Sequence, residues 1–335
     1  MDDASPPNSS SRHVPARLIP TPTTVSPQLQ RSIAMAAAAP APDFSRAPQT
    51  SEQWRAFAAA NDALSMQRMA DLSAMFPYQA SEREVAGVRV REITPASLDP
   101  ARAGRVLVHL HGGGYVMGAG EAGLGEGVLG AHYARTRVIS VDYRMPPDHP
   151  FPAAVDDAVA VWKAVIAEHA PASVGVFGTS AGGGLLLAMA LKLKTLGVAL
   201  PGALAPSTPW ADLAGESDSY AVHAGVDSVL TQYPGVVEAM AKLYAGPVSL
   251  YDPLVSPVQG DFAGFPPTIL TTGTRDSLLS DTVRVYRAMR AAGVEARLVV
   301  HEAMSHAEYA YAFDAPESAT VFTDIADFFK KHLAG

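Results

Sequence analysis

The pattern of apolar and polar residues changes twice along the chain. Residues 1–24 hold five prolines among Ser, Thr and Asn and show no apolar repeat. Residues 25–80 show apolar side chains at helical spacing, and from about residue 85 short β-branched runs alternate with helical stretches. Short apolar runs are typical of buried strands, and a 3.6-residue repeat is typical of amphipathic helices.

The first 80 residues predict a flexible tail followed by two helices. Residues 1–24 carry too little apolar surface to offset the entropy lost on ordering. Ser26-Pro27 is typical of a helix start, because serine caps a helix and proline is accepted at its first position. A second helix is expected from near Ser51 until Pro77 ends it.

The rest of the chain predicts the α/β class. We expect strands at Val85–Ile93, Arg105–His111, Arg137–Asp142, Ser173–Phe177, Pro267–Thr272 and Ala296–His301. Helical stretches lie between these strands and close the chain. Such alternation predicts a mostly parallel sheet with helices on both faces.

One segment, residues 209–255, interrupts this alternation with Gly, Pro, Ser and Asp and holds one expected helix, Gly235–Tyr244. Ligands of parallel sheets bind beyond the carboxyl ends of the strands, so an insertion there can roof a site together with the N-terminal helices. We therefore expect a flexible tail at 1–24, cap helices at 25–80, a main α/β domain at 81–208 and 256–335, and a cap insertion at 209–255.

Composition and charge exclude several function classes. The chain has 335 residues, of which 48% are hydrophobic and 17% charged, which is enough for a substantial core. Its net charge of −8 provides no basic field for nucleic acid, so we expect no nucleic-acid partner. No apolar run reaches the roughly 20 residues of a membrane-spanning helix, so we expect no integral membrane association.

The chain start and the absence of cysteine bear on the compartment. Without cysteine the chain has no disulfides and no thiolate-bound metal clusters. It opens Met1-Asp2-Asp3, whereas an export signal begins with basic residues before an apolar stretch. We expect a cytoplasmic protein, with export, suggested by Ala36–Ala39, as the alternative. The sequence leaves open whether the protein forms a homodimer.

The strongest chemical signal is a GxSxG turn at Gly178–Gly182. It follows a predicted strand and precedes the apolar helical run Leu185–Leu191, which is the strand, turn and helix order of a nucleophile elbow. This order exposes Ser180 Oγ at the sheet edge, above the positive end of a helix dipole. A glycine turn needed only for packing is the alternative, and the context disfavours it.

A second glycine motif, HGGG at His111–Gly114, ends an earlier predicted strand. Acyl transfer needs amide N–H groups aimed at the developing oxyanion, and glycines let the backbone approach it. The N–H groups of Gly113 and Gly114 are the expected donors. Ala181, which follows the serine, is the expected third donor.

A serine nucleophile also needs a base, and the base needs a carboxylate to orient it. Asp276 follows the predicted strand 267–272, and His306 lies on the loop after 296–301. The chain order of Ser180, Asp276 and His306 is the order of α/β-hydrolases.

Other residues compete for these roles. Asp281 is an alternative acid, but its position predicts a helix cap or first-turn acid. His301 is expected to make a structural hydrogen bond at a strand end. His109 and His111 share a strand face and form a candidate metal pair; without a third ligand, we expect no metal.

These motifs resemble the bacterial hormone-sensitive-lipase-like esterase family from about Val25 to the C-terminus. Asp142–Ala154 (DYRMPPDHPFPAA) and Asp252–Pro257 (DPLVSP) extend the resemblance beyond HGGG and GTSAGG. The threonine of GTSAGG places the chain nearer the subgroup with that spelling. The sequence departs from the family at Glu308, where an aromatic residue is usual, and in the loose, glycine-rich run Gly118–Gly130.

The resemblance implies an α/β-hydrolase fold with a helical cap and no cofactor. It implies hydrolysis of small-molecule esters with short to medium acyl chains by the triad Ser180, Asp276 and His306. Amide, lactone or carbamate substrates, or a non-catalytic ligand-binding protein, are the alternatives.

Tyr115 and Trp210 are candidate substrate-binding residues, and core packing is the alternative, because aromatic residues in a chain this apolar are more often core. An acid at Glu308 is expected to raise the pKa of His306 or to point to solvent. We expect Arg144, Asp148 and Asp156 to hold loops together.

Overall fold

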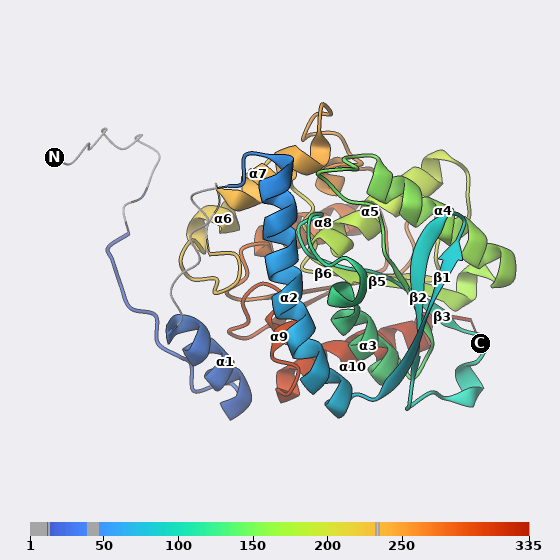
Figure 1. Ribbon diagram of the computed structural model, residues 1–335, viewed down its shortest axis with the longest axis horizontal. Helices are drawn as coiled ribbons and strands as arrows, with labels where there is room; N and C mark the ends of the chain where they lie inside the picture. The colour runs from blue at the N-terminus through green and yellow to red at the C-terminus, as the bar shows by residue number, and fades with distance from the viewer. Residues whose placement is uncertain (1–11, 13, 39–46, 232, 234, 335) are drawn as a thin grey trace.

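Eight strands form one mostly parallel sheet in the computed structural model, which describes residues 12, 14–38, 47–231, 233 and 235–334 (Figure 1). The strands are β1 (Tyr78–Val85), β2 (Val88–Pro95), β3 (Val106–Leu110), β4 (Val138–Val141), β5 (Val174–Thr179), β6 (Ala203–Ser207), β7 (Thr268–Gly273) and β8 (Ala296–His301). They are ordered β1-β2-β4-β3-β5-β6-β7-β8. Only β1 with β2 and β2 with β4 pair antiparallel. The expected fold class is confirmed.

Helices flank both faces of the sheet. They are α1 (Pro27–Ala38), α2 (Ser51–Met75), α3 (Leu124–Ala134), α4 (Ala153–Glu168), α5 (Ala181–Thr195), α6 (Asp218–Val222), α7 (Val236–Ala245), α8 (Leu279–Ala291), α9 (Glu308–Tyr311) and α10 (Pro316–His332). Short 3₁₀ turns occur at Pro100–Arg102, Gly120–Gly123, Pro171–Ser173 and Pro257–Gln259. Half of the predicted tail 1–24, namely residues 1–11 and 13, lies outside the described residues. In the described part of this tail, the Pro20 carbonyl oxygen accepts a hydrogen bond from the Arg275 side chain at 3.0 Å.

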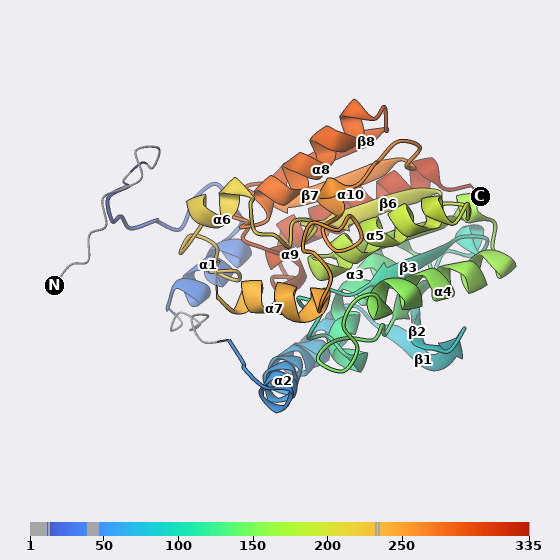
Figure 2. The ribbon, with the colours of Figure 1, turned by 90° about the horizontal axis from the view of Figure 1, so that it is seen from above.

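Side chains of the central strands alternate between two cores. In β3, Val106, Val108 and Leu110 join the core beneath α4, α5 and α8, while Leu107 joins the core of α3 and α10. Successive strand residues point to opposite faces, so a strand covered on both sides is apolar throughout. Figure 1 shows α4 and α5 above the sheet and α3 and α10 below it, and Figure 2 shows the strands fanning from β8 to β2.

The structure differs from the sequence analysis at three elements. The expected strand Val85–Ile93 is a hairpin: Ala86 and Gly87, with φ of 52° and 81°, turn the chain between β1 and β2. β6 was not expected, because its sequence, ALAPS, lacks β-branched residues although it is buried throughout.

The third difference concerns the glycine-rich run Gly118–Gly130, whose second half is the helix α3, which the sequence did not predict. Its glycines allow close packing. A Cβ at Gly130 would lie 2.5 Å from the Phe177 ring, and one at Gly127 would lie 2.9 Å from Ile93. Glycine lowers helix propensity, so the sequence pattern did not mark this helix, which tertiary packing stabilises.

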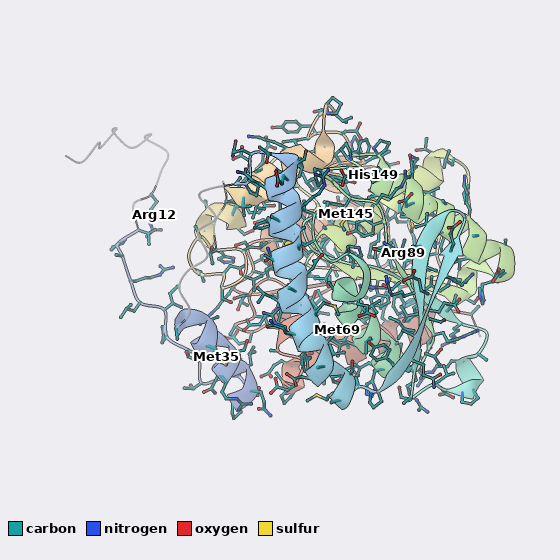
Figure 3. The ribbon with its side chains drawn as sticks, in the orientation of Figure 1. Arg12, Met35, Met69, Arg89, Met145 and His149 are labelled. Carbon is teal, nitrogen blue, oxygen red and sulfur yellow. The ribbon has the colours of Figure 1, made fainter. Side chains whose placement is uncertain are left out.

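Residues of the predicted cap form α1, α2, α6 and α7. A capping box at Thr50 and Gln53 starts α2, as the sequence predicted near Ser51. Met69 on α2, labelled in Figure 3, and Leu72 approach the start of α3 at Gly125. No helix in the described part of the chain has the length and apolarity needed to cross a membrane.

Candidate active site

Ser180 lies at the tight turn between β5 and α5. Its backbone has φ 60° and ψ −124°, a strained conformation for a residue with a side chain. Its N–H donates to the Ser207 carbonyl at 3.0 Å, and its carbonyl accepts from Gly184 and Trp210, both at 2.9 Å. The Ser180 hydroxyl makes no capping hydrogen bond to α5, which leaves it available for chemistry.

Two glycines make this turn sterically feasible. A Cβ at either Gly178 or Gly182 would overlap the carbonyl oxygen of Leu110 at the end of β3. The close approach of β3 and the elbow therefore requires glycine at both positions.

A buried network that sequence reasoning missed supports the elbow from below. Glu126 accepts from the Thr179 N–H at 3.1 Å and from the Thr179 hydroxyl at 2.5 Å. The same carboxylate lies 3.2 Å from His109 Nε2, and the Tyr309 hydroxyl lies 2.7 Å from the Thr179 hydroxyl. These bonds fix the residue that precedes Ser180.

The HGGG segment passes directly beside the serine. A Cβ at Gly112 would lie 3.5 Å from the Ser180 Cβ. Gly113 and Gly114 have positive φ values of 108° and 61°. Within the described part of the chain, no group accepts from the N–H of Gly113, Gly114 or Ala181. The three expected donors are thus available to an anion beside Ser180.

Ion pairs anchor the segment that follows HGGG. Asp142, at the end of β4, pairs with Arg89 at 2.7 Å (labelled in Figure 3) and accepts from the Gly120 N–H at 3.0 Å. Asp62 on α2 accepts from the Gly118 N–H at 2.7 Å. The predicted cap helix is therefore bonded to the loop that carries the candidate oxyanion donors.

Asp276 and His306 form a buried pair. His306 Nδ1 lies 3.1 Å from Asp276 Oδ1, and both side chains are almost fully buried. Asp276 also accepts from Leu278 N–H at 2.8 Å, from Thr272 at 2.7 Å and from the Thr208 hydroxyl. A buried carboxylate needs such a full set of donors.

The electrostatics of this pair favour the charged forms. Burial alone would raise the pKa of Asp276, but His306 and the surrounding donors hold it below its ordinary value. Burial alone would lower the pKa of His306, but the charge and hydrogen bond of Asp276 raise it above its ordinary value. Such an imidazole readily accepts a proton from a neighbouring hydroxyl.

Thr208 links this pair to the elbow. Its hydroxyl lies 3.1 Å from His306 Nδ1 and donates to Asp276. Its neighbour Ser207 accepts the Ser180 N–H. The Asp276–His306 pair, from the loops after β7 and β8, therefore lies beside Thr208, whose neighbour Ser207 accepts from the backbone of Ser180. The triad of Ser180, Asp276 and His306 stays a prediction. Thr208 carries no motif signal, so sequence reasoning missed it.

The competing residues serve other purposes. Asp281 is the first-turn acid of α8, as expected, and accepts from the Ala211 and Asp212 N–H groups at 3.0 and 2.8 Å. Burial raises the pKa of Asp281 to about 7. We expected His301 to make a structural hydrogen bond. Its Nε2 is buried and has no hydrogen-bond partner among the described residues, so this expectation is wrong for that atom.

Neither strand histidine lies in a metal cluster. His109 bonds Ser140 and Glu126, and His111 stacks on Tyr143 with ring centroids 4.1 Å apart. The described residues hold no group of three or more His, Asp or Glu side chains placed to bind a metal ion.

Glu308 does not point to solvent, so that expectation is wrong. It is 2% exposed and accepts from the Ser305 N–H and the Ser32 hydroxyl, both at 2.9 Å. It therefore ties α1 to the loop of His306. The largest charge effects that raise the pKa of His306 come from Asp276, Asp227 and Asp281, and an effect of Glu308 on this pKa stays a prediction.

The remaining predicted residues are buried or paired. Tyr115 stacks on Tyr244 at 3.7 Å, and Trp210 lies beside Tyr115 with ring centroids 6.0 Å apart. Arg144 and Asp148 anchor the loop between β4 and α4, as expected, through ion pairs with Asp157 and Arg55. Asp156 lies within α4 and pairs with Lys192 of α5, so the expectation that it holds a loop is wrong.

Comparison with known proteins assigns the family. The family model described as alpha/beta hydrolase fold matches residues 107–310, which include the elbow, the HGGG segment and the Asp276–His306 pair. The chain belongs to the alpha/beta hydrolase fold family. Among relatives of this alpha/beta hydrolase, an acetyl-hydrolase of Streptomyces hygroscopicus is 32% identical over 74% of this chain and 83% of the relative. An esterase of Acinetobacter venetianus is 30% identical over 73% and 79% of the two chains.

Several solved structures are also similar to this alpha/beta hydrolase. One crystal structure of an esterase matches with a TM-score of 0.92 and 38% identity, over 97% of this chain and 99% of that chain. A crystal structure of an esterase from the bacterial hormone-sensitive lipase family matches with a TM-score of 0.78 and 29% identity, over 92% and 99%.

Two glycine substitutions test the steric account of the elbow. Gly182→Ala is expected to lower the free energy of unfolding by about 3 kcal/mol or more, because the new methyl group overlaps a backbone carbonyl. Gly125→Ala, the matched change in α3, places its methyl group 3.6 Å from Leu72, an ordinary contact, and is expected to change stability by less than about 1 kcal/mol. Urea unfolding measures both, and equal stabilities would contradict the account.

Proposed function

We propose that this alpha/beta hydrolase cleaves short- to medium-chain carboxylic esters through an acyl-enzyme on Ser180, with His306 as base and Asp276 as its orienting acid. The observation that carries the proposal is the buried His306–Asp276 contact of 3.1 Å, linked through Thr208 and Ser207 to the strained serine turn. The relatives and solved structures named above are an acetyl-hydrolase and esterases, and the chain is a carboxylic ester hydrolase.

The proposed reaction has two halves. Ser180 Oγ attacks the ester carbonyl carbon while His306 takes the hydroxyl proton, and the N–H groups of Gly113, Gly114 and Ala181 stabilise the oxyanion. The C–O bond to the alcohol then breaks, and His306 returns the proton to the leaving oxygen. Water attacks the acyl-enzyme by the same route and releases the acid and free Ser180.

Membership of the bacterial hormone-sensitive-lipase-like esterases is part of the proposal. The HGGG and GTSAGG motifs support it, together with the likeness to an esterase of that family. The relatives include proteins named acetyl-hydrolase and ethyl acetate hydrolase, which supports short acyl chains as substrates.

We also propose that residues 25–80 and 209–255 act as the cap. Asp62 of α2 bonds Gly118, and a Cβ at Gly114 would lie 2.6 Å from the Met240 sulfur of α7, so both segments contact the oxyanion loop. Such a roof limits acyl length. The cytoplasmic location and the homodimer remain predictions.

A series of 4-nitrophenyl esters from acetate to palmitate tests the proposal. The rate of hydrolysis is expected to fall sharply beyond about eight acyl carbons, because the cap closes the acyl site. Ser180→Ala is expected to lower kcat by at least about 10⁴-fold without changing the thermal unfolding curve. Full activity in that variant would overturn the assignment, and faster cleavage of matched anilides than of esters would favour the amide alternative.

Two aspartate variants distinguish the acid. Asp276→Asn is expected to lower kcat by roughly 10³- to 10⁴-fold, because the amide can hold the imidazole in the wrong tautomer. Asp281→Asn is expected to retain kcat within about tenfold, since Asp281 bonds the backbone of the insertion and not the imidazole. Steady-state kinetics measures both, and the reverse order of losses would exchange the roles of the two residues.

A further inference from the structure

A second buried carboxylate lies beside the Asp276–His306 pair. Asp227 belongs to the insertion, after α6, and is 1% exposed. Its Oδ2 accepts from the N–H of Ser277, the residue after Asp276, at 2.7 Å. The backbone N–H of His306 lies 3.4 and 3.3 Å from its Oδ1 and Oδ2. One side chain therefore contacts the backbone of both triad loops.

Neighbouring residues of the insertion reinforce these contacts. The N–H and hydroxyl of Ser228 lie 3.1 and 3.0 Å from the Ser305 hydroxyl, next to His306. His223 Nδ1 lies 2.8 Å from the Asp276 carbonyl oxygen. Residues 223–228 thus hold the two loops to each other and to the insertion.

Asp227 is itself held rigidly in its segment. Its Oδ1 accepts from the N–H groups of Val229 and Leu230 at 2.8 and 3.0 Å. Among the described residues, every group that hydrogen-bonds to this carboxyl is an N–H donor, which satisfies the ionised form, as a buried charge requires. An anion that is held rigidly and accepts from the backbone of both loops can set the distance between those loops.

We propose that Asp227 is a positioning residue for the ester hydrolysis proposed above: it sets the spacing of the Asp276 and His306 loops and places a second negative charge beside the imidazole. The inference rests on that proposed function, because only a reaction that protonates His306 uses this charge. No sequence motif in the insertion identified Asp227 as a candidate.

Several charged and titratable groups surround this centre. The charges of Asp276, Asp227 and Asp281 act on His306. Besides burial, the charge of Asp227 also raises the pKa of Glu308 and of Tyr311, while Arg275 lowers that of Glu308. Burial and then Asp276 raise the pKa of Asp227, while His306 and the amide donors oppose that rise. Burial opposes protonation of His306, whereas Asp276 and then Asp227 raise the pKa of His306.

The test is the pH dependence of the Asp227→Asn variant. An amide presents one acceptor oxygen in place of two, so one set of backbone N–H groups loses its partner and the triad loops shift. We expect kcat to fall roughly 10- to 100-fold with little change in KM. The acid limb of kcat/KM rises as His306 loses its proton, and removing a charge that raises the pKa of His306 moves this limb to lower pH.

Three further variants separate position from charge. Asp227→Glu retains the charge on a longer side chain, so kcat is expected to fall while the acid limb stays at the wild-type pH. Ser228→Ala removes a loop contact without removing charge and is also expected to leave the acid limb in place. Asp252→Asn removes another insertion carboxylate, which bonds Leu254 N–H at 2.8 Å, and is expected to leave both kcat and the limb unchanged.

An unmoved acid limb with wild-type kcat in Asp227→Asn would overturn the proposal. Should that variant not fold, wild-type kcat in Asp227→Glu would overturn it equally. Failure of the proposed function is distinct, since it appears as an absence of Ser180-dependent turnover in the wild-type protein. In that case NMR titration of His306 decides: a lower pKa in Asp227→Asn supports the electrostatic role, and an unchanged pKa overturns it.

Discussion

The contact between His306 and Asp276 is the interaction on which the candidate site depends. A carboxylate in a dry interior is costly unless donors surround it. Asp276 meets this requirement with four donors: Thr272 of β7, and Thr208, Leu278 and His306 from the loops after β6, β7 and β8. The parallel sheet makes this convergence feasible, because the carboxyl ends of β5 to β8 lie at one edge.

The close approach of β3 to the elbow is the second constraint. Leu110, at the end of β3, leaves no room for side chains at Gly178 and Gly182, and the HGGG segment continues directly from that strand. Candidate oxyanion donors and nucleophile are therefore positioned by the same steric fit. The buried carboxylate of Glu126 then fixes Thr179, so the strained serine is held on both sides.

The predicted cap segments contribute to the site through the backbone. Asp227 of the insertion contacts both the Asp276 loop and the His306 loop, while Asp62 of α2 bonds the glycine-rich segment. α1 reaches the histidine loop through Ser32 and Glu308. Opening or displacing these segments would alter the triad loops as well as access to the site.

The sequence predicted the parts of the site that carry compact motifs. Ser180, Gly113, Gly114 and Ala181 lie in glycine turns whose context is local, and Asp276 and His306 follow strands in the chain order of the fold. The α/β class followed from the alternation of apolar patterns and is confirmed.

What the sequence did not predict depends on long-range contacts. β6 is buried with little β-branched character, and α3 contains glycines because Phe177 and Ile93 leave no room for larger residues. Thr208, Asp227 and Glu126 are single polar residues, each of which bonds a residue 50 or more positions away. No local pattern marks such partners, so only the folded chain identifies them.

Covalent labelling with diethyl 4-nitrophenyl phosphate tests the central claim most directly, because the Ser180 oxygen must displace nitrophenolate from phosphorus with help from His306. Mass spectrometry of the intact protein and its peptides should find one diethylphosphoryl group, on Ser180. The label should be absent in Ser180→Ala and form far more slowly in His306→Ala. Labelling of another residue, or an undiminished rate without the imidazole, would contradict the account.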